Sequence, residues 1–274
     1  MTGLSRHAPA AGGGRHVACD LLDARSAQQL ISRLAPQVVV HAQAMSDVDQ
    51  CELDPAAARD QNVRTTAQLI EALANTGALL VYVSTDYVFD GTKGAPYRET
   101  DEPHPISVYG RTKRDAEQLA LDYGHSVVVR PSTLFGPGRH NFCDHVVSQL
   151  SANKPVEAFS DQVTSPTSTE DAAEALADLI LSLEDSRAGV GPRVYHVANA
   201  GGCSRSGFAR RIAQLLDRPE ELVVSIPMAQ QRRPAQRPAC SALTTDQLTH
   251  QIGRTLRPWD EALEAYLRQR HWLN

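Results

Sequence analysis

The sequence contains no long apolar run, no closely spaced cysteine pair and no excess of positive charge. None of its 274 residues belongs to an apolar stretch near the roughly 20 residues that a membrane-spanning helix needs. The N-terminus, MTGLSRHAPAAGGGRH, lacks the apolar core and cleavage site of a signal peptide. Lys and Arg total 27 against 32 Asp and Glu, a net charge of −5 that offers nucleic acid no long-range attraction. We expect a soluble protein that binds neither membranes nor nucleic acid.

Patterns typical of disulfides and metal sites are also missing. The five cysteines are odd in number and far apart in the chain, so we expect reduced thiols in the cytoplasm. None of the ten histidines shows an HxxxH or His/Cys spacing, and the sequence therefore predicts no metal site.

What the sequence does contain is an alternation of strand-like and helix-like segments. The strand-like segments are β-branched and apolar, which is typical of strands covered on both faces. Segments with helical spacing separate them, and this order predicts βαβ units and an α/β fold with a parallel sheet. We expect strands at residues 37–44, 78–84, 126–136 and 194–200, and helices at 54–77, 107–123, 169–183, 206–216 and 258–268.

The C-terminal third is less regular, and we interpret part of it as a second, smaller lobe. The core then comprises residues 1–136 and 167–200, and an α+β lobe comprises residues 137–166 and 201–274. A Pro- and Arg-rich loop in this lobe includes Arg232, Arg233 and Arg237. Because arginine forks match phosphate oxygens, this loop is a candidate diphosphate site, and a solvated loop is the equal alternative.

One polar constellation has the residue types of an acid–base site. Ser84-Thr85-Asp86-Tyr87 ends a predicted strand, while Tyr109 and Lys113 stand four residues apart on one face of a predicted helix. A free phenol, with a pKa of about 10, exchanges protons poorly at neutral pH, and a neighbouring ammonium lowers that pKa. With a hydroxyl from Thr85 or Ser84, the group can polarise a ketone and protonate the alkoxide that hydride transfer creates. Surface helices also carry Tyr-x-x-x-Lys pairs by chance.

Longer segments carry a resemblance to a known family. STDYVFDG (84–91), PYRETDEPHPISVYGRTK (96–113) and DQVTSPTSTEDAA (161–173) resemble the extended short-chain dehydrogenase/reductases. Within them, the sequence is most similar to the dTDP-4-dehydrorhamnose reductase family, whose relatives include the regulatory β subunit of methionine adenosyltransferase. VYHVANAGGCSRSGFARRIA (194–213) and RPACSALTTDQL (237–248) are similar to the C-terminal lobe of that family. The resemblance extends from about Val38 to the C-terminus.

The resemblance implies a fold and a reaction. The fold is a Rossmann-type parallel sheet that binds the dinucleotide, with the smaller lobe binding a nucleotide sugar. The reaction is hydride transfer from NADPH or NADH to the 4-keto carbon of a dTDP-4-keto-6-deoxysugar, a step of deoxysugar biosynthesis. An epimerase or dehydratase also uses Tyr-x-x-x-Lys, but the segments at 161–173 and 237–243 favour the reductases.

The resemblance also implies roles for individual residues. Thr85 would bind the keto oxygen, Tyr109 would donate the proton, and Lys113 would hold the nicotinamide ribose and lower the phenol pKa. The implied cofactor residues are Arg6, Asp20, Leu21, Ala42, Gln43, Ala44, Ser84 and Lys113. The implied substrate residues are Tyr87, Phe89, Asn141, Phe142, Pro166, Thr167 and Arg237. Arg6 stands where a guanidinium would meet an adenosine 2′-phosphate, which favours NADPH over NADH.

One element of the family pattern is absent. The family begins with a strand that enters a GxxGxxG turn, whose amides face the cofactor pyrophosphate. Here Met1–Arg6 resembles the end of the second strand of the family, and Gly12–Gly14 follows a Pro/Ala loop, where we expect a flexible surface loop. The strand at 38–41 would then expose an edge, unless N-terminal residues rearrange to cover it.

Two explanations for this absence stay open. In the first, which we favour, the start codon is placed too late or the sequence is a clipped piece of a longer chain. In the second, the chain has lost dinucleotide binding and acts as a non-catalytic sugar-nucleotide, partner-binding or regulatory protein. The intact Thr85, Tyr109 and Lys113 favour an enzyme. Association into a homodimer is an open question.

Overall fold

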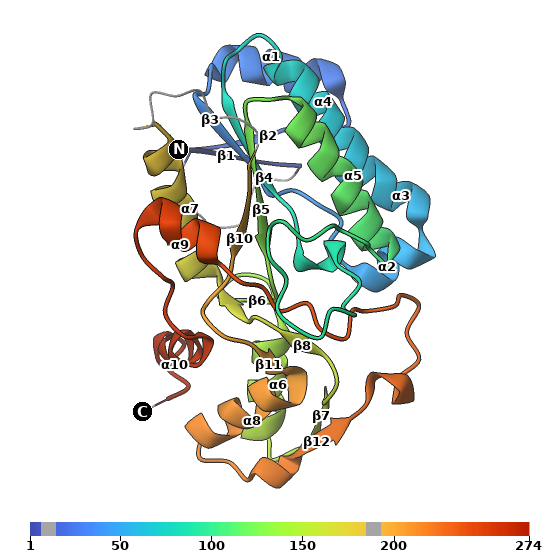
Figure 1. The fold of residues 1–274 in the computed structure, drawn as a ribbon, viewed down its shortest axis with the longest axis vertical. Coiled ribbons are helices and arrows are strands. Elements are labelled where there is room, and N and C mark those ends of the chain that lie inside the picture. The colour runs from blue at the N-terminus through green and yellow to red at the C-terminus, as the bar shows by residue number, and fades with distance from the viewer. Residues whose placement is uncertain (7–14, 185–192, 274) are drawn as a thin grey trace. The chain divides into compact units, whose positions relative to one another are not determined.

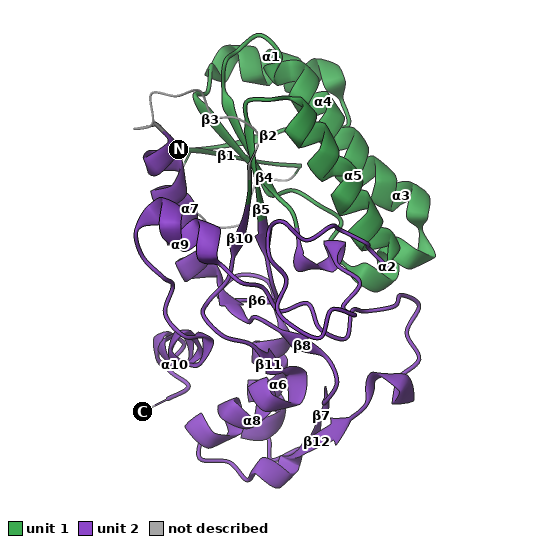
Figure 2. Cartoon of the chain, viewed as in Figure 1, with its two compact units in different colours: residues 1–84, 107–129, 188–194 green, residues 85–106, 130–187, 195–274 purple. Residues whose placement is uncertain are grey.

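The chain folds into two compact units, each with its own apolar core. The computed structural model describes residues 1–6, 15–184 and 193–273. Unit 1 contains residues 1–84, 107–129 and 188–194, and unit 2 contains residues 85–106, 130–187 and 195–274 (Figure 2). The glycine run Gly12–Gly14, for which a surface loop was expected, lies outside the described residues.

A four-stranded sheet with the order β10-β5-β4-β3 confirms the predicted α/β fold (Figure 1). β4 pairs in parallel with both β3 and β5, with Val39 opposite Leu80 and Val81 opposite Val127. Four of the five residues of β4 are buried, as its uninterrupted apolar sequence predicted. The strands are β3 (Val38–His41), β4 (Leu79–Val83), β5 (Ser126–Pro131) and β10 (Arg193–Val197).

The strand predicted at 126–136 is shorter and is interrupted. β5 ends at Pro131, and a separate strand, β6 (Leu134–Phe135), pairs with β9 (Thr167–Ser168). Between them Thr133 has a φ of +25°, a conformation that a regular strand does not contain. The apolar composition of the segment did not reveal this break.

Strand β3 forms the edge of the four-stranded sheet within the described part of the chain. β1 (Thr2–Ser5) and β2 (Arg15–Ala18) pair with each other in a separate parallel sheet. The side of β3 away from β4 carries no described strand. Val40 of β3 is 48% exposed. β3 is therefore the edge of the sheet as far as the described residues extend.

Four of the five α-helices described for unit 1 begin at caps that are visible in the sequence, and α4 has no side-chain cap. Asp23, Asp47, Asp54 and Ser107 each accept hydrogen bonds from backbone amides of the first helical turn. Helices α1, α4 and α5 bury apolar side chains such as Ile31, Leu69 and Ala116 together with Leu80 and Val128 of the sheet. The five helices are α1 (Ala24–Leu34), α2 (Val48–Leu53), α3 (Pro55–Arg59), α4 (Thr65–Leu73) and α5 (Val108–Asp122).

The single helix predicted at 54–77 consists of three parts. A π-helical turn at Asp60–Arg64 separates α3 from α4. The buried side chain of Asn62 in this turn hydrogen-bonds to both backbone groups of Met45 and to Thr112. The wider turn thus brings a polar side chain into a position that helical periodicity would assign to an apolar one.

Unit 2 has a core of helices and short strands. Phe208 lies at its centre, with Phe135, Phe142 and Trp259 at ring-centroid distances of 5.6, 6.2 and 5.6 Å. Trp272 lies edge-on to Tyr266 and so packs against the last helix of the chain. The other elements are α6 (Phe142–Ser151), β7 (Val156–Phe159), β8 (Val163–Thr164), α7 (Thr169–Glu184), β11 (Cys203–Ser204), α8 (Arg205–Leu215), β12 (Val223–Ile226), α9 (Asp246–Ile252) and α10 (Trp259–Gln269). Over the described ranges, the helices are all too short or too polar to cross a membrane.

Candidate functional site

Lys113 lies on α5, inside unit 1, and its environment is strongly perturbed. The side chain is 2% exposed, and its Nζ donates a 2.6 Å hydrogen bond to the carbonyl oxygen of Val83. Burial lowers the pKa of the ammonium to about 7, although the carboxylate of Glu117 opposes that shift. Tyr109 lies one turn earlier on the same helix, in the first turn after the Ser107 cap. A buried lysine with a pKa near neutrality is typical of a functional position.

Asn62 connects the helix of Lys113 to the loop that follows β3. Its Oδ1 accepts a 2.7 Å hydrogen bond from the amide of Met45. Its Nδ2 donates to the Met45 carbonyl at 3.2 Å and to Thr112 Oγ1 at 2.9 Å. Asn62 therefore holds the 42–45 loop against α5 next to Lys113. Sequence reasoning did not identify this residue, and its only signal was a polar side chain within an apolar helical pattern.

The residues expected to bind the cofactor all lie in unit 1. Ala42, Gln43 and Ala44 directly follow β3, and Ser84 directly follows β4, so they lie at the carboxyl ends of parallel strands. Ser84 Oγ and Gln43 Oε1 are buried polar atoms without a hydrogen-bond partner in the described structure. An orphaned hydroxyl, an orphaned amide oxygen and a buried ammonium suit a polar ligand such as a nicotinamide ribose.

The other predicted cofactor residues occupy turns near the N-terminus. Arg6 is exposed just after β1. Asp20 accepts a 2.9 Å hydrogen bond from the amide of Leu22, which fixes the turn that contains Leu21.

Asp86, in unit 2, is the centre of a buried hydroxyl cluster. Its carboxylate accepts hydrogen bonds from Thr85 at 3.2 Å, from Ser132 at 2.9 Å and from Ser241 at 2.5 Å. Burial raises the pKa of Asp86, while the three hydroxyls and the charge of Arg205 lower it. Thr85 also accepts a hydrogen bond from the amide of Tyr87. The cluster fixes the Thr85 side chain, and sequence reasoning had assigned no role to its central carboxylate.

The resembling segments 84–91 and 237–248 meet in the fold of unit 2. Gly91 has a φ of +83°, and a Cβ there would lie 2.6 Å from Pro238 and Ala239. The Cys240 amide donates to the Gly91 carbonyl, and Ser241 donates to Asp86. This close approach explains why a glycine ends the first segment.

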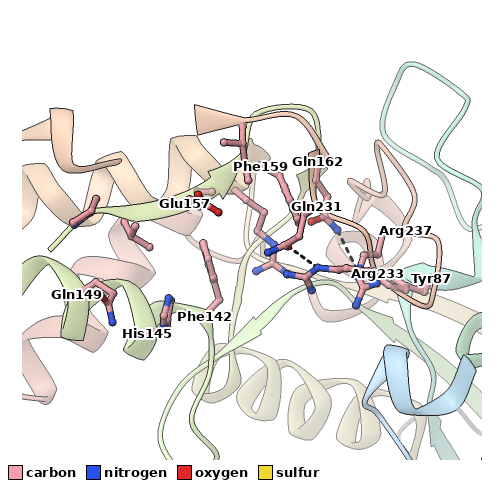
Figure 3. Close-up of a pocket in the computed structure, with 15 residues that line it drawn as sticks. Tyr87, Phe142, His145, Gln149, Glu157, Phe159, Gln162, Gln231, Arg233 and Arg237 are labelled. Atoms are coloured by element: carbon pink, nitrogen blue, oxygen red, sulfur yellow. Dashed lines mark hydrogen bonds between the residues drawn. The ribbon is translucent and has the colours of Figure 1, made fainter. Parts of the chain in front are cut away.

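A cavity of about 520 Å³ in unit 2 collects part of the predicted substrate site (Figure 3). Tyr87, Phe142 and Arg237, for which the resemblance implied a substrate role, all line it. Figure 3 shows Tyr87 and Arg237 at one end and Gln149 at the other, with Phe142 and His145 of the same helix as Gln149 between them. Gln162 donates a 3.1 Å hydrogen bond to the Tyr87 hydroxyl. The volume is that of a site for a small organic molecule.

The cavity is electropositive. Arg205, Arg233 and Arg237 line it, and Glu157 is the one carboxylate among its lining residues in the described structure. Burial raises the pKa of the Tyr87 phenol, and the charges of Arg205 and Arg237 oppose that shift. Of the basic loop, Arg233 and Arg237 line the cavity and Arg232 does not. Arg205 was not identified from the sequence, because no spacing motif connects it to the loop.

The remaining predicted substrate residues do not line this cavity. Phe89 is buried and stacks on Tyr97 with a centroid distance of 4.1 Å. Asn141 caps α6 by accepting hydrogen bonds from the Cys143 and Asp144 amides. Pro166 and Thr167 are buried beside and within β9. All the predicted substrate residues nevertheless belong to unit 2, as does Thr85, whereas Tyr109 and Lys113 belong to unit 1.

Comparisons with known proteins agree with these features. The sequence profile of the RmlD substrate binding domain family matches residues 2–271. The spore coat polysaccharide biosynthesis protein SpsK of Bacillus subtilis (strain 168) is 34% identical over 92% of this chain and 86% of its own length. A dTDP-4-dehydrorhamnose reductase of Mycobacterium tuberculosis (strain CDC 1551 / Oshkosh) is 37% identical over 90% of this chain and 81% of its own. A crystal structure of dTDP-4-dehydrorhamnose reductase from Bacillus anthracis str. Ames in complex with NADP superposes with a TM-score of 0.82. It has 27% identity and covers 93% of this chain and 89% of that one.

Proposed function

The chain belongs to the RmlD substrate binding domain family, and we propose that it reduces the keto group of a nucleotide-linked 4-keto-6-deoxysugar with NADPH or NADH. The observation that carries this proposal is the arginine-lined cavity of unit 2. Three guanidiniums against one carboxylate favour a ligand with two or more negative charges, as a nucleoside diphosphate sugar has. The domain division fits the same proposal, with unit 1 residues for the cofactor and unit 2 residues for the substrate.

In the proposed mechanism, Tyr109 protonates the sugar oxygen. When bound, NADPH or NADH supplies the hydride. Lys113, Ser84 and the 42–44 loop would hold the nicotinamide ribose, and Arg6, Asp20 and Leu21 the adenosine end. The Lys113 ammonium favours the phenolate that Tyr109 becomes after it loses its proton. Thr85, fixed by Asp86, donates a hydrogen bond to the keto oxygen as negative charge develops there.

The hydrogen bond between Thr85 and Asp86 connects this mechanism to the observed contacts. Thr85 has a single hydroxyl proton, which in the described structure it donates to Asp86 over a long 3.2 Å bond. Substrate binding would turn that proton toward the keto oxygen and leave Asp86 with its donors Ser132 and Ser241.

Reduced cysteines and a free nicotinamide pool are both found in the cytoplasm, where we propose that the enzyme works.

The direct test measures NADPH oxidation with dTDP-4-dehydrorhamnose as substrate, the 4-keto-6-deoxysugar that the names of the relatives give. We expect turnover by the wild-type chain and a loss of at least about 100-fold in kcat for Tyr109→Phe, because the proton donor is removed. Tyr123→Phe is the matched control, since Tyr123 caps the far end of α5 and hydrogen-bonds to the Ala78 carbonyl. Wild-type activity in Tyr109→Phe would refute the assigned proton donor.

A second candidate function is nucleotide-sugar binding without reduction. Among the described strands β3 lies at the edge of its sheet, and this position favours the second function because it leaves less sheet surface for a dinucleotide. A titration of NADPH fluorescence separates the two functions. Micromolar NADPH binding supports the reductase, and dTDP binding without any NADPH binding supports the binding protein.

A further inference from the structure

The guanidinium of Arg205 is held in the cavity by stacking alone. Its Cζ lies 4.8 Å from the centroid of the Phe142 ring. Within the described structure its side chain forms no hydrogen bond and no ion pair, although Arg205 lines the cavity. By contrast, Arg237 Nη1 donates to the Ala235 carbonyl at 2.8 Å, and Arg233 Nε donates to Gln231 at 2.7 Å.

The charge of Arg205 acts on the segment that carries Thr85. Burial raises the pKa of Tyr87, and the charge of Arg205 is the largest of the effects that lower it. The same charge also lowers the pKa of Asp86. Arg205 therefore connects Phe142, toward the α6 end of the cavity, with Tyr87 at the other end. A partly buried cation with unused donors is stabilised when an anion reaches it, and the planar fork suits two phosphate oxygens.

We propose that Arg205 binds the sugar-proximal phosphate of the substrate and thereby selects nucleoside diphosphate sugars. The proposal rests on the proposed function, because it takes the cavity as the nucleotide-sugar site. Arg205 lines the same cavity as Tyr87, which lies two residues after Thr85 in the chain. Its role is to select and position the substrate, and it transfers no proton.

The test compares the binding of dTDP and dTMP by isothermal titration calorimetry. Arg205→Met keeps an unbranched side chain over Phe142 and removes the charge. We expect its Kd for dTDP to rise about 10- to 100-fold, since a charge-assisted hydrogen bond contributes that order of affinity. The Kd for dTMP, which lacks the second phosphate, should change less than about threefold. Arg205→Lys should recover part of the loss, because it restores the charge without the fork.

Arg210→Met is the matched control on the same helix. Arg210 is directed to Ser225 and does not line the cavity, yet its replacement changes the net charge equally. We expect dTDP affinity within about twofold of the wild type. An Arg205→Met variant that retains wild-type dTDP affinity, or loses dTMP affinity equally, would overturn the assignment of Arg205. A wild-type chain that binds no dTDP would overturn the proposed function as well.

Discussion

The Lys113 ammonium lies 4.3 Å from the centre of the Tyr82 ring. The aromatic face and the Val83 carbonyl stabilise a charge that is otherwise cut off from water. These contacts do not fully replace hydration, and the pKa of Lys113 is consequently lowered to about 7. Because Lys113 changes its charge near neutral pH, we expect both the stability and the activity of the protein to depend on pH in this range.

Stability should depend on pH through Lys113. Unfolded, the lysine has its ordinary pKa of 10.5, and folded, about 7. Between these values the unfolded chain holds a proton that the folded chain does not, so the free energy of unfolding rises with pH across this window. Lys113→Met lacks the effect, and the wild type should gain stability relative to it from pH 7 to 10.5. Urea unfolding at several pH values measures this, and parallel curves would contradict it. Exposed Lys154→Met is the control.

The alkaline limb of the pH profile of kcat/KM should report the titration of Lys113. If the ammonium form of Lys113 assists Tyr109, kcat/KM falls as the pH rises through about 7, since kcat/KM reports the free enzyme. Lys113→Arg keeps the charge at higher pH, so its falling limb should move upward, whatever the rate that it retains. An unmoved limb would assign that titration to another group.

Asn62→Ala should destabilise unit 1. The substitution leaves the Met45 amide and carbonyl and the Thr112 hydroxyl without their buried partner. We expect the free energy of unfolding to fall by about 1–3 kcal/mol. We also expect the affinity for NADPH to fall more than the affinity for dTDP. Urea titration measures the first and ligand titration the second. Gln118→Ala, on the exposed face of α5, should stay within about 0.5 kcal/mol of the wild type.

Asp86→Ala should destabilise more than Asp86→Asn. Alanine removes the acceptor that Thr85, Ser132 and Ser241 share, whereas asparagine keeps one acceptor oxygen. We expect costs of about 2–4 kcal/mol for alanine and about 1–2 kcal/mol for asparagine, measured by chemical unfolding. Equal costs would show that the hydroxyls find other partners. Both variants should also lower kcat, because Thr85 loses its fixed orientation.

Much of the fold could be predicted because its signals are local. Val38–His41 and Leu79–Val83 are apolar and β-branched, and Asp54-Pro55 and Ser107 start helices by capping amides close to them in the chain. Motif resemblance predicted a substrate role for Tyr87, Phe142 and Arg237; that role stays a prediction, and the structure shows that the three residues line one cavity. The break at Thr133 and the π-helical turn at Asn62 were missed, because each depends on a distant pairing.

The sequence by itself determined the alternation of strands and helices and the polar residues at the strand ends. Periodicity and capping depend on neighbours a few residues apart, and the chain carries that information directly. Only the tertiary structure decided that Asp86 gathers Ser132 and Ser241, and that Arg205 faces the cavity from Phe142 to Tyr87. Such groupings arise when side chains far apart in the chain are buried together, because packing and desolvation then select partners that no local pattern encodes.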